Sequence, residues 1–372
     1  MERCLTKPLL QQLNTLLAKI QEIGIAEKKL TGFTIGNTTK LCDQNFYFTP
    51  IRNTSIMIVG GVIVYTEEQA LHIAKYIDGQ IDYILVDAEK KLPNSSSLTG
   101  EAANIERTVR EALEVSKLWI YKGNDLSVEA IDGLLTQLTR KSVRGIGGKK
   151  VAILGGGNLG AKLALKLVER GANVFLTRRN QDYLEKIVEA INLIKPVYTQ
   201  AKLVGVMTNE EAVRGAEVLI VCTPGKPVVD RGMISSLARK AIVIDAGKGT
   251  LFEDAILFCE KRKIKIYRLD ITAAFEGMIH SFRTAESILD RRFGRRKMYG
   301  ENLVSGGLLA RRDEIVVDNI REPLQVFGIA DGRGDFVRKL SDSQKSRIAK
   351  LDKTIQSFKE RLDKNNLDRK NV

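Results

Sequence analysis

The sequence is poor in the residues that build metal centres and disulfide frameworks. Among 372 residues there are only four cysteines and two histidines. The cysteines form no C-x-x-C pair, which argues against a disulfide framework and against a structural zinc site. A metal site made of several histidines is excluded, because the sequence contains only His72 and His280. We therefore predict no metal site. The scattered cysteines are Cys4, Cys42, Cys222 and Cys259.

The chain also lacks a long apolar run. The longest one, residues 55–65, carries two glycines and is too short to cross a bilayer, which takes about 20 apolar residues. The first eight residues contain no apolar signal-peptide core. These absences predict a soluble, cytoplasmic protein in a reducing compartment, with no membrane partner.

Positive charge is in excess. The chain has 59 Lys and Arg against 45 Asp and Glu, a formal net charge of +14. Such an excess favours anionic partners such as phosphorylated cofactors, acidic metabolites or nucleic acid, but it does not determine the fold. Hydrophobic residues make up 44% of the chain, which is enough for sizeable cores, and the length fits two domains of ordinary size.

The hydrophobic pattern predicts an α/β protein. In the first part, strands are expected at 56–65 and 83–86, between helices at 8–24, 66–76, 102–118 and 127–138. Residues 31–54 are polar and are interpreted as irregular. A basic, glycine-rich stretch, 139–150, separates this part from a second alternation of strands and helices. The six strands expected there are 151–154, 174–176, 203–206, 218–222, 241–244 and 264–269.

Apolar strands separated by helices are typical of parallel sheets covered on both faces. We therefore predict an N-terminal α/β substrate domain over 1–140 and a doubly wound nucleotide-binding domain over 141–290. A C-terminal extension over 291–372 contains an amphipathic helix, through which two copies of the chain can associate. Its apolar stripe is Ile348, Leu351, Ile355, Phe358 and Leu362.

The most specific motif is G-x-G-x-x-G-A at 155–161, directly after an apolar strand and before a helix. Gly155 allows the tight turn, Gly157 lets the backbone approach a pyrophosphate, and Gly160 lets helix and strand pack closely. Asn158 and Leu159 open the helix, whose free amides attract phosphate. The motif predicts dinucleotide binding by a Rossmann domain; the alternative is a turn that binds nothing.

The end of the second strand of this domain indicates which dinucleotide is bound. NAD-binding domains usually place a carboxylate there, whereas this chain has Thr177, Arg178 and Arg179. A guanidinium can pair with the 2′-phosphate of NADP, which a carboxylate would repel. NADP is therefore favoured over NAD, and the alternative is two solvated arginines.

Two later strand ends have similar short loops. Cys222, Thr223 and Pro224 follow one strand, and Gly247 lies just after another. Ligands of doubly wound sheets bind at the carboxyl ends of the strands. We predict that these residues line the cofactor site, although each could be turn chemistry alone.

The chain resembles the amino-acid-dehydrogenase-like proteins, and shikimate dehydrogenase in particular. Thr177-Arg178-Arg179 resembles that family's N-R-T, and Glu276-Gly277-Met278-Ile279 resembles its G-M-L. Gly123-Asn124-Asp125 resembles its N-T-D, and Lys90 or Lys91 stands near the place of its catalytic lysine. The resemblance implies an NADP-dependent dehydrogenase in which Gly277 and Met278 line the nicotinamide pocket. The strand-and-loop series 218–249 is also similar to methylenetetrahydrofolate dehydrogenase.

An enzyme that transfers a hydride also needs a group that donates or accepts a proton. A lysine that is shielded from water beside a carboxylate can be that group. Lys90 or Lys91 paired with Asp125 is the predicted catalytic group, with a solvated surface loop as the alternative. The predicted function is an NADP-dependent oxidoreductase acting on a carbonyl, imine or alcohol carbon of a small acidic metabolite. The alternatives are a non-catalytic NADP sensor and, less favoured because no RNA-binding module is recognised, an RNA-linked protein using the basic cluster at 291–297.

Overall fold

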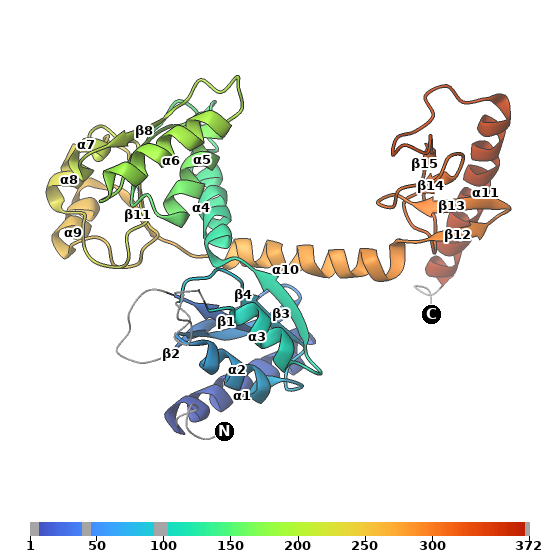
Figure 1. The fold of residues 1–372 in the computed structure, drawn as a ribbon, viewed down its shortest axis with the longest axis horizontal. Helices are drawn as coiled ribbons and strands as arrows, with labels where there is room; N and C mark the ends of the chain where they lie inside the picture. Colours follow the sequence, from blue (N-terminus) through green and yellow to red (C-terminus); the bar gives the residue numbers. More distant parts are fainter. Residues whose placement is uncertain (1–6, 39–45, 93–102, 369–372) are drawn as a thin grey trace. The chain divides into compact units, whose positions relative to one another are not determined.

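The structure is a computed structural model that describes residues 7–38, 46–92 and 103–368 (Figure 1). The chain forms two compact units, Met1–Ile279 and His280–Val372. The first unit contains two separate sheets and the second contains one smaller sheet. Because the sheets of the first unit are largely parallel and carry helices, the predicted α/β fold class is confirmed.

The first sheet has five strands in the order β2-β3-β1-β4-β5, with β2 antiparallel to β3 and the other pairs parallel. Its core is built from the apolar faces of the sheet and of three helices, with Leu13, Phe33 and Ile73 fully buried. The elements are α1 (Lys7–Glu27), β1 (Leu30–Asn37), β2 (Phe46–Asn53), β3 (Met57–Val64), α2 (Glu67–Ile77), β4 (Tyr83–Asp87), α3 (Ile105–Ala112) and β5 (Lys117–Tyr121).

Two sequence-based predictions for this sheet are wrong. Residues 31–54, expected to be irregular, contain β1 and β2. In β1 the polar residues Thr34 and Asn37 are buried, and their side chains donate to the carbonyl oxygens of Gly60 and Asp87. A central strand that is polar at these positions does not show the apolar run expected of one. The helix expected at 102–118 ends at Ala112, and Leu118 belongs to β5.

The second sheet has six parallel strands in the order β11-β10-β9-β6-β7-β8. The first strand of the series, β6, therefore lies at the centre and the chain winds outward in both directions, as in a Rossmann fold. All six strands were predicted. The elements are β6 (Lys150–Leu154), α5 (Asn158–Glu169), β7 (Asn173–Thr177), α6 (Gln181–Ile194), β8 (Leu203–Val206), α7 (Asn209–Val213), β9 (Val218–Val221), α8 (Arg231–Ser236), β10 (Ile242–Asp245), α9 (Glu253–Arg262) and β11 (Lys265–Arg268).

Helix α4 (Gly123–Thr139) connects the two sheets. Its buried Ile131 and Leu135 belong to the core of the Rossmann sheet, together with Leu163 of α5. Ion pairs between α4 and α5 reinforce this packing: Lys166 pairs with Glu129, and Arg170 pairs with Asp132. Helix α4 is thus attached to the second sheet, while the division of the chain at residue 140 stays a prediction.

The second unit contains a four-stranded sheet in the order β12-β13-β14-β15 and the long helix α11. No strand was predicted here. Leu351 and Ile355 of α11 are buried against Leu303 and Ile329 of the sheet. Their part of the apolar stripe is thus buried inside the unit, and the association of two copies through this helix stays a prediction. The side chains of Phe358 and Leu362 lie outside the described part. The bounds are α10 (Thr272–Ser287), η1 (Ile288–Arg292), β12 (Arg295–Met298), β13 (Glu301–Ser305), β14 (Ile315–Val317), β15 (Val326–Ile329) and α11 (Asp342–Asp368).

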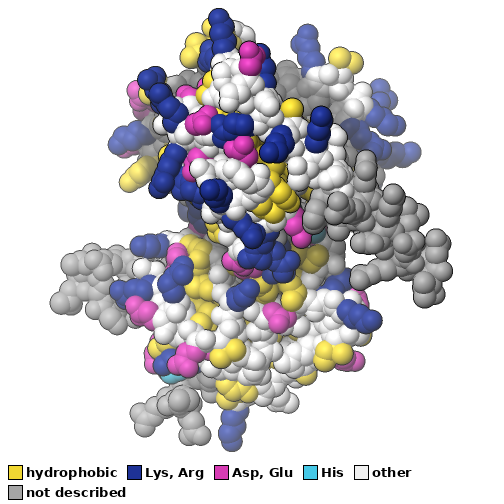
Figure 2. Space-filling model, turned by 90° about the vertical axis from the view of Figure 1, so that its right-hand side faces the viewer, with side chains coloured by type: hydrophobic (Ala, Val, Ile, Leu, Met, Phe, Trp, Pro, Cys, Tyr) yellow, Lys and Arg dark blue, Asp and Glu magenta, His cyan; other side chains and the backbone are white. Residues whose placement is uncertain are grey.

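The positive charge of the chain is visible on its surface. Figure 2 shows many Lys and Arg side chains on one face, with Asp and Glu side chains between them. None of the helices in the described ranges combines the length and apolarity needed to cross a bilayer.

Candidate functional site

The glycine-rich turn between β6 and α5 is built so that two of its glycines cannot be replaced. Gly155 has φ +107°, in the left-handed region, and a Cβ there would lie 3.0 Å from the carbonyl carbon of Cys222. A Cβ on Gly160 would lie 2.1 Å from the carbonyl oxygen of Gly155. The first glycine is thus required by the turn and the last by the packing of α5 on the turn.

Gly157 is different, because a Cβ built on it meets no atom within 4 Å. It is the N-cap residue of α5. Packing within the chain therefore does not require a glycine here, and the open space lies at the N-terminus of a helix whose first amides have no intrahelical partner. Those amides belong to Asn158, Leu159 and Gly160. A pyrophosphate fits this position in both charge and size.

Of the three residues at the end of β7, the first has a buried side chain and the two arginines can reach a ligand. Thr177 is buried, and its hydroxyl bonds with Oδ1 of Asn209 at 2.8 Å. The Arg178 guanidinium donates to the carbonyl oxygen of Gly156 and lies 5.0 Å from the ring centroid of Tyr183. Arg179 is exposed. Arg178 thus lies against the glycine turn, and Arg179 extends into solvent.

The loop after β9 lies against the same turn, and the loop after β10 lies against the loop after β9. A Cβ on Gly247 would lie 1.9 Å from the carbonyl oxygen of Thr223, so the two loops touch. The Thr223 hydroxyl oxygen is buried without a hydrogen-bond partner in the described part of the chain. An unpaired buried hydroxyl is costly, so this atom fits a polar group of a ligand. Burial raises the pKa of the Cys222 thiol to about 12, which makes it a poor nucleophile, and Pro224 is exposed.

Gly277 and Met278 lie in the second turn of α10, not at its start as the resemblance implies. Gly277 is exposed and Met278 is half-buried. The residues of this segment that line a cavity are Ile271 and Phe275. Within the described ranges, no group of three or more His, Cys, Asp or Glu side chains could hold a metal ion.

A cavity of about 570 Å³ lies at the carboxyl ends of both sheets of the first unit. On the Rossmann side its wall includes Leu159, directly after the glycine turn, and Gly247. On the other side it is lined by residues at the ends of β1, β4 and β5, among them Asn37, Asp87 and Tyr121. Carboxyl ends of parallel strands are where ligands of such sheets bind, so this cavity is the candidate substrate site.

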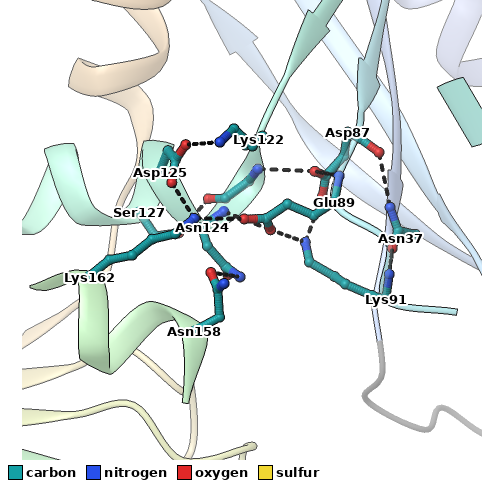
Figure 3. Close-up of polar contacts among 11 residues, drawn as sticks. Asn37, Asp87, Glu89, Lys91, Lys122, Asn124, Asp125, Ser127, Asn158 and Lys162 are labelled. Atoms are coloured by element: carbon teal, nitrogen blue, oxygen red, sulfur yellow. Dashed lines mark hydrogen bonds and ion pairs between the residues drawn. The ribbon is translucent and has the colours of Figure 1, made fainter. Parts of the chain in front are cut away.

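Lys91 lines this cavity between two carboxylates (Figure 3). Its ammonium nitrogen lies 2.6 Å from Oδ2 of Asp87 and 2.9 Å from Oε2 of Glu89. The side chain of Asp87 is only 4% exposed and also accepts a hydrogen bond from the amide of Gly123, at the start of α4. Two buried or half-buried carboxylates therefore hold the lysine in one place.

Asp125 is not a direct partner of Lys91. Its carboxylate pairs with Lys162 of α5 at 2.5 Å and with Lys122 at 3.1 Å. Lys162 also reaches Oε1 of Glu89 at 3.4 Å, so Glu89 and Lys162 link the two predicted catalytic groups (Figure 3). Lys90 is exposed.

The motif residue Asn124 connects the network with the glycine turn. Its backbone amide donates to Glu89 at 3.1 Å, and its side-chain amide donates to Oδ1 of Asn158 at 3.1 Å. A residue at the start of α4 thus touches the first residue of the dinucleotide-binding helix. The two halves of the candidate site share one polar network.

The predicted role of Lys91 as a proton acceptor requires a lowered pKa, but its surroundings raise that pKa. Burial by itself lowers the pKa of Lys91, but the charge of Asp87 and hydrogen bonds with Asp87 and Glu89 raise that pKa above its ordinary value. Burial raises the pKa of Asp125, yet its hydrogen bonds with Lys162 and Lys122 lower it overall. Lys91 is therefore a cation at neutral pH and a poor base.

Sequence reasoning missed several residues of the cavity wall, namely Asn37, Thr49, Arg52, Tyr121 and Lys248. Asn37, Thr49 and Arg52 lie on the two strands that were interpreted as irregular. Glu89 and Lys162 had no motif to mark them, and only their contacts identify them.

Comparison with known proteins supports the second sheet as a cofactor domain. Residues 150–249 match the family described as NADP oxidoreductase, coenzyme F420-dependent. This segment begins with β6 and contains the glycine turn and Arg178. It is an NADP-binding Rossmann domain of the oxidoreductase type, which confirms the predicted cofactor.

Curated relatives match over a similar short region. Glycerol-3-phosphate dehydrogenase [NAD(P)+] of Limosilactobacillus reuteri (strain DSM 20016) is 30% identical over 109 residues, 27% of this chain and 32% of that protein. The enzyme of the same name from Bacillus subtilis (strain 168) is 28% identical over 123 residues, 32% and 36% of the two chains. The chain thus spans about a third of the length of these relatives.

Among solved structures, the A chain of dipicolinate synthase from Bacillus subtilis is 16% identical and covers 70% of this chain and 98% of its own length. The TM-score is 0.34, and a likeness this distant carries no argument about activity.

Proposed function

We propose that the chain is an NADP-dependent oxidoreductase acting on a carbonyl, imine or alcohol carbon of a small acidic metabolite. The observation that supports this most is the cavity, which Leu159 in the first turn of α5 and the end of β10 border on one side and Lys91 on the other. A cofactor held at the turn would have its reactive end at the strand ends that line this cavity.

Several residues of the second sheet would hold the cofactor. Gly157 and the first amides of α5 would hold the pyrophosphate, and Arg178 and Arg179 would pair with the 2′-phosphate. The Thr223 hydroxyl would bond with a polar group of the cofactor. The bound nicotinamide would supply or accept the hydride.

Lys91 would supply charge and a proton at the reacting oxygen or nitrogen of the substrate. Its ammonium group can stabilise negative charge that develops there and can donate a proton. Asp87 and Glu89 favour the ammonium form, so the proton would return quickly to Lys91. Asp125 would act indirectly, by fixing Lys162 and through it Glu89.

The comparisons give no specific support for the resemblance to shikimate dehydrogenase, and the identity of the substrate is not predicted. The cytoplasmic location stays a prediction. A non-catalytic NADP sensor is the second candidate function. The observation that favours it is the engagement of Lys91 by two carboxylates, which leaves no strong base in the network.

The experiment is a titration of the purified protein with NADPH, followed by a turnover screen. Candidate oxo acids, imino acids and hydroxy acids would be supplied with NADPH or NADP and followed at 340 nm, the absorbance of the reduced nicotinamide. Turnover of an acid substrate supports the oxidoreductase. Tight NADPH binding without turnover across the panel supports the sensor, and absence of NADPH binding contradicts both.

Cofactor preference gives a specific expectation. The wild-type protein should bind NADPH more tightly than NADH, and the Arg178→Ala/Arg179→Ala variant should lose about 10- to 100-fold in NADPH affinity and little in NADH affinity. The reason is that both arginines follow β7 and only NADPH carries the 2′-phosphate. Fluorescence titration measures the four dissociation constants. Equal affinity of the wild type for the two cofactors would show that the arginines do not bind the phosphate.

A further inference from the structure

Arg52 is a half-buried cation in the wall of the cavity. Its guanidinium carbon lies 5.7 Å from the ring centroid of Phe275. The hydroxyl and the amide of Thr272 both donate to Oδ1 of Asp270 and are the main reason that the pKa of this carboxyl is lowered; the charge of Arg52 lowers it further. Within the described residues no carboxylate forms an ion pair or a hydrogen bond with the Arg52 guanidinium, so several of its N–H donors are left for a ligand.

A β-bulge turns Arg52 toward the cavity. Thr49 pairs with Gly61 of β3 and Arg52 pairs with Val59, so three steps along β2 match two steps along β3. In a regular strand, residues three apart lie on opposite faces, but the extra residue of a bulge brings them to the same face. Pro50 lies in this irregular segment, where its lack of an N–H does no harm.

Thr49 shares the cavity wall and supplies a second unpaired group. Its hydroxyl oxygen is buried and has no hydrogen-bond partner among the described residues. A buried hydroxyl and a half-buried guanidinium are both costly without partners, so their placement on one face of one strand needs a ligand to balance them.

The charge of the cavity wall has the sign that such a ligand needs. Among the described residues of the wall, Asp87 is the one carboxylate, and it is paired with Lys91. The cationic side chains that line the cavity are Arg52, Lys91, Lys248 and Arg268. The rings of Tyr121 and Phe275 pack edge to face with centroids 6.4 Å apart, and Arg52 lies over the ring of Phe275. A planar guanidinium on an aromatic ring presents a fork of donors that matches an oxyanion.

We propose that Arg52 and Thr49 form the specificity-determining end of the cavity, where they bind an oxyanion group of the substrate, either a carboxylate or a phosphate. This inference rests on the proposed function, because it gives the acidic substrate a place opposite the cofactor. The rest of the substrate then extends from Arg52 toward Lys91 and the end of β10.

The test uses calorimetric titration of the full chain, with and without NADPH, at constant ionic strength. The probes are benzoate, its neutral counterpart benzamide, and inorganic phosphate. The wild type should bind benzoate or phosphate and not benzamide. The Arg52→Gln variant should lose about 10- to 100-fold in affinity for that anion. Arg52→Lys should lose less, because it keeps the charge but not the fork, and Thr49→Val should lose the contribution of one hydrogen bond.

Arg231→Gln is the matched control. Arg231 also stacks on a phenylalanine, 4.9 Å from the ring centroid of Phe258, but does not line the cavity. The Arg231→Gln variant should bind the anion with the affinity of the wild type, and the NADPH affinity should be unchanged in all variants. Stronger binding of benzoate indicates a carboxylate substrate, and stronger binding of phosphate a phosphorylated one.

Equal anion affinity of Arg52→Gln and Arg231→Gln would overturn the inference, and so would a wild type that binds neither anion. A wild type that does not bind NADPH would refute the proposed function instead. In that case the titrations without NADPH still decide whether Arg52 binds an anion.

Discussion

Gly157→Val is expected to fold normally and to lose dinucleotide binding. A Cβ at this position meets no atom of the chain within 4 Å, so the branched side chain costs little in packing. The same side chain would occupy the space in front of the first amides of α5. Loss of two charge-assisted hydrogen bonds from these amides to phosphate would weaken NADPH binding by about 100-fold or more.

Two other glycines serve as controls for that measurement. Gly133 on α4 also has open space at its Cβ position, and Gly133→Val should leave NADPH affinity unchanged. Gly160→Val should fail to fold properly, because its Cβ would collide with the carbonyl oxygen of Gly155. Thermal unfolding reports on the fold and fluorescence titration on binding. If the Gly157→Val protein folds and binds NADPH as tightly as the wild type, the pyrophosphate does not bind at this turn.

Lys91→Met is expected to lower turnover by about 10²- to 10⁴-fold, the usual value of a positioned proton donor. Methionine keeps most of the packing of the lysine stem and removes the ammonium group from the cavity. NADPH affinity should stay nearly constant, because the residues proposed to bind NADPH belong to the other sheet. The measurement compares kcat and the NADPH dissociation constant, with a substrate found in the turnover screen.

Lys91→Met also removes the ammonium partner of a buried carboxylate, so we expect the variant to lose stability as well as turnover. Breaking a buried ion pair costs about 3–5 kcal/mol, and less here because Lys91 is 21% exposed. Combining Lys91→Met with Asp87→Asn removes both charges while keeping an oxygen for the amide of Gly123. This double variant should regain stability but not turnover.

Lys90→Met, at the exposed neighbouring position, is the matched control and should keep full activity. Recovery of turnover in the double variant would mean that Lys91 has only a structural role. Loss of activity in Lys90→Met and not in Lys91→Met would mean that the wrong lysine was assigned.

The Rossmann sheet could be predicted from the sequence because its determinants are local. The central strands β6, β9 and β10 are short, largely buried apolar runs between helices, and such runs are typical of parallel sheets covered on both faces. Gly155 and Gly160 are required by a turn of a few residues and by the packing of α5 on it, and Gly157 completes the spacing that identifies the motif.

The first sheet was only partly predictable because some of its strands depend on distant partners. Thr34 and Asn37 are polar, and they can be buried in β1 only because Gly60 and Asp87 supply carbonyl oxygens from β3 and β4. In the second unit, β12 to β15 contain three to five residues each, and α11 far along the chain buries their apolar side chains. Neither dependence is visible in a local pattern.

The sequence by itself determined the doubly wound cofactor domain and the choice of Lys91 as one of two catalytic candidates. Only the tertiary structure decided that Lys91 pairs with Asp87 and Glu89, that Asp125 pairs with Lys162, and that a bulge turns Arg52 into the cavity. Strand and turn patterns repeat over a few residues, so short-range sterics and burial encode them. Ion pairs join residues far apart in the chain, and their choice among many lysines and carboxylates depends on how the sheets and helices pack.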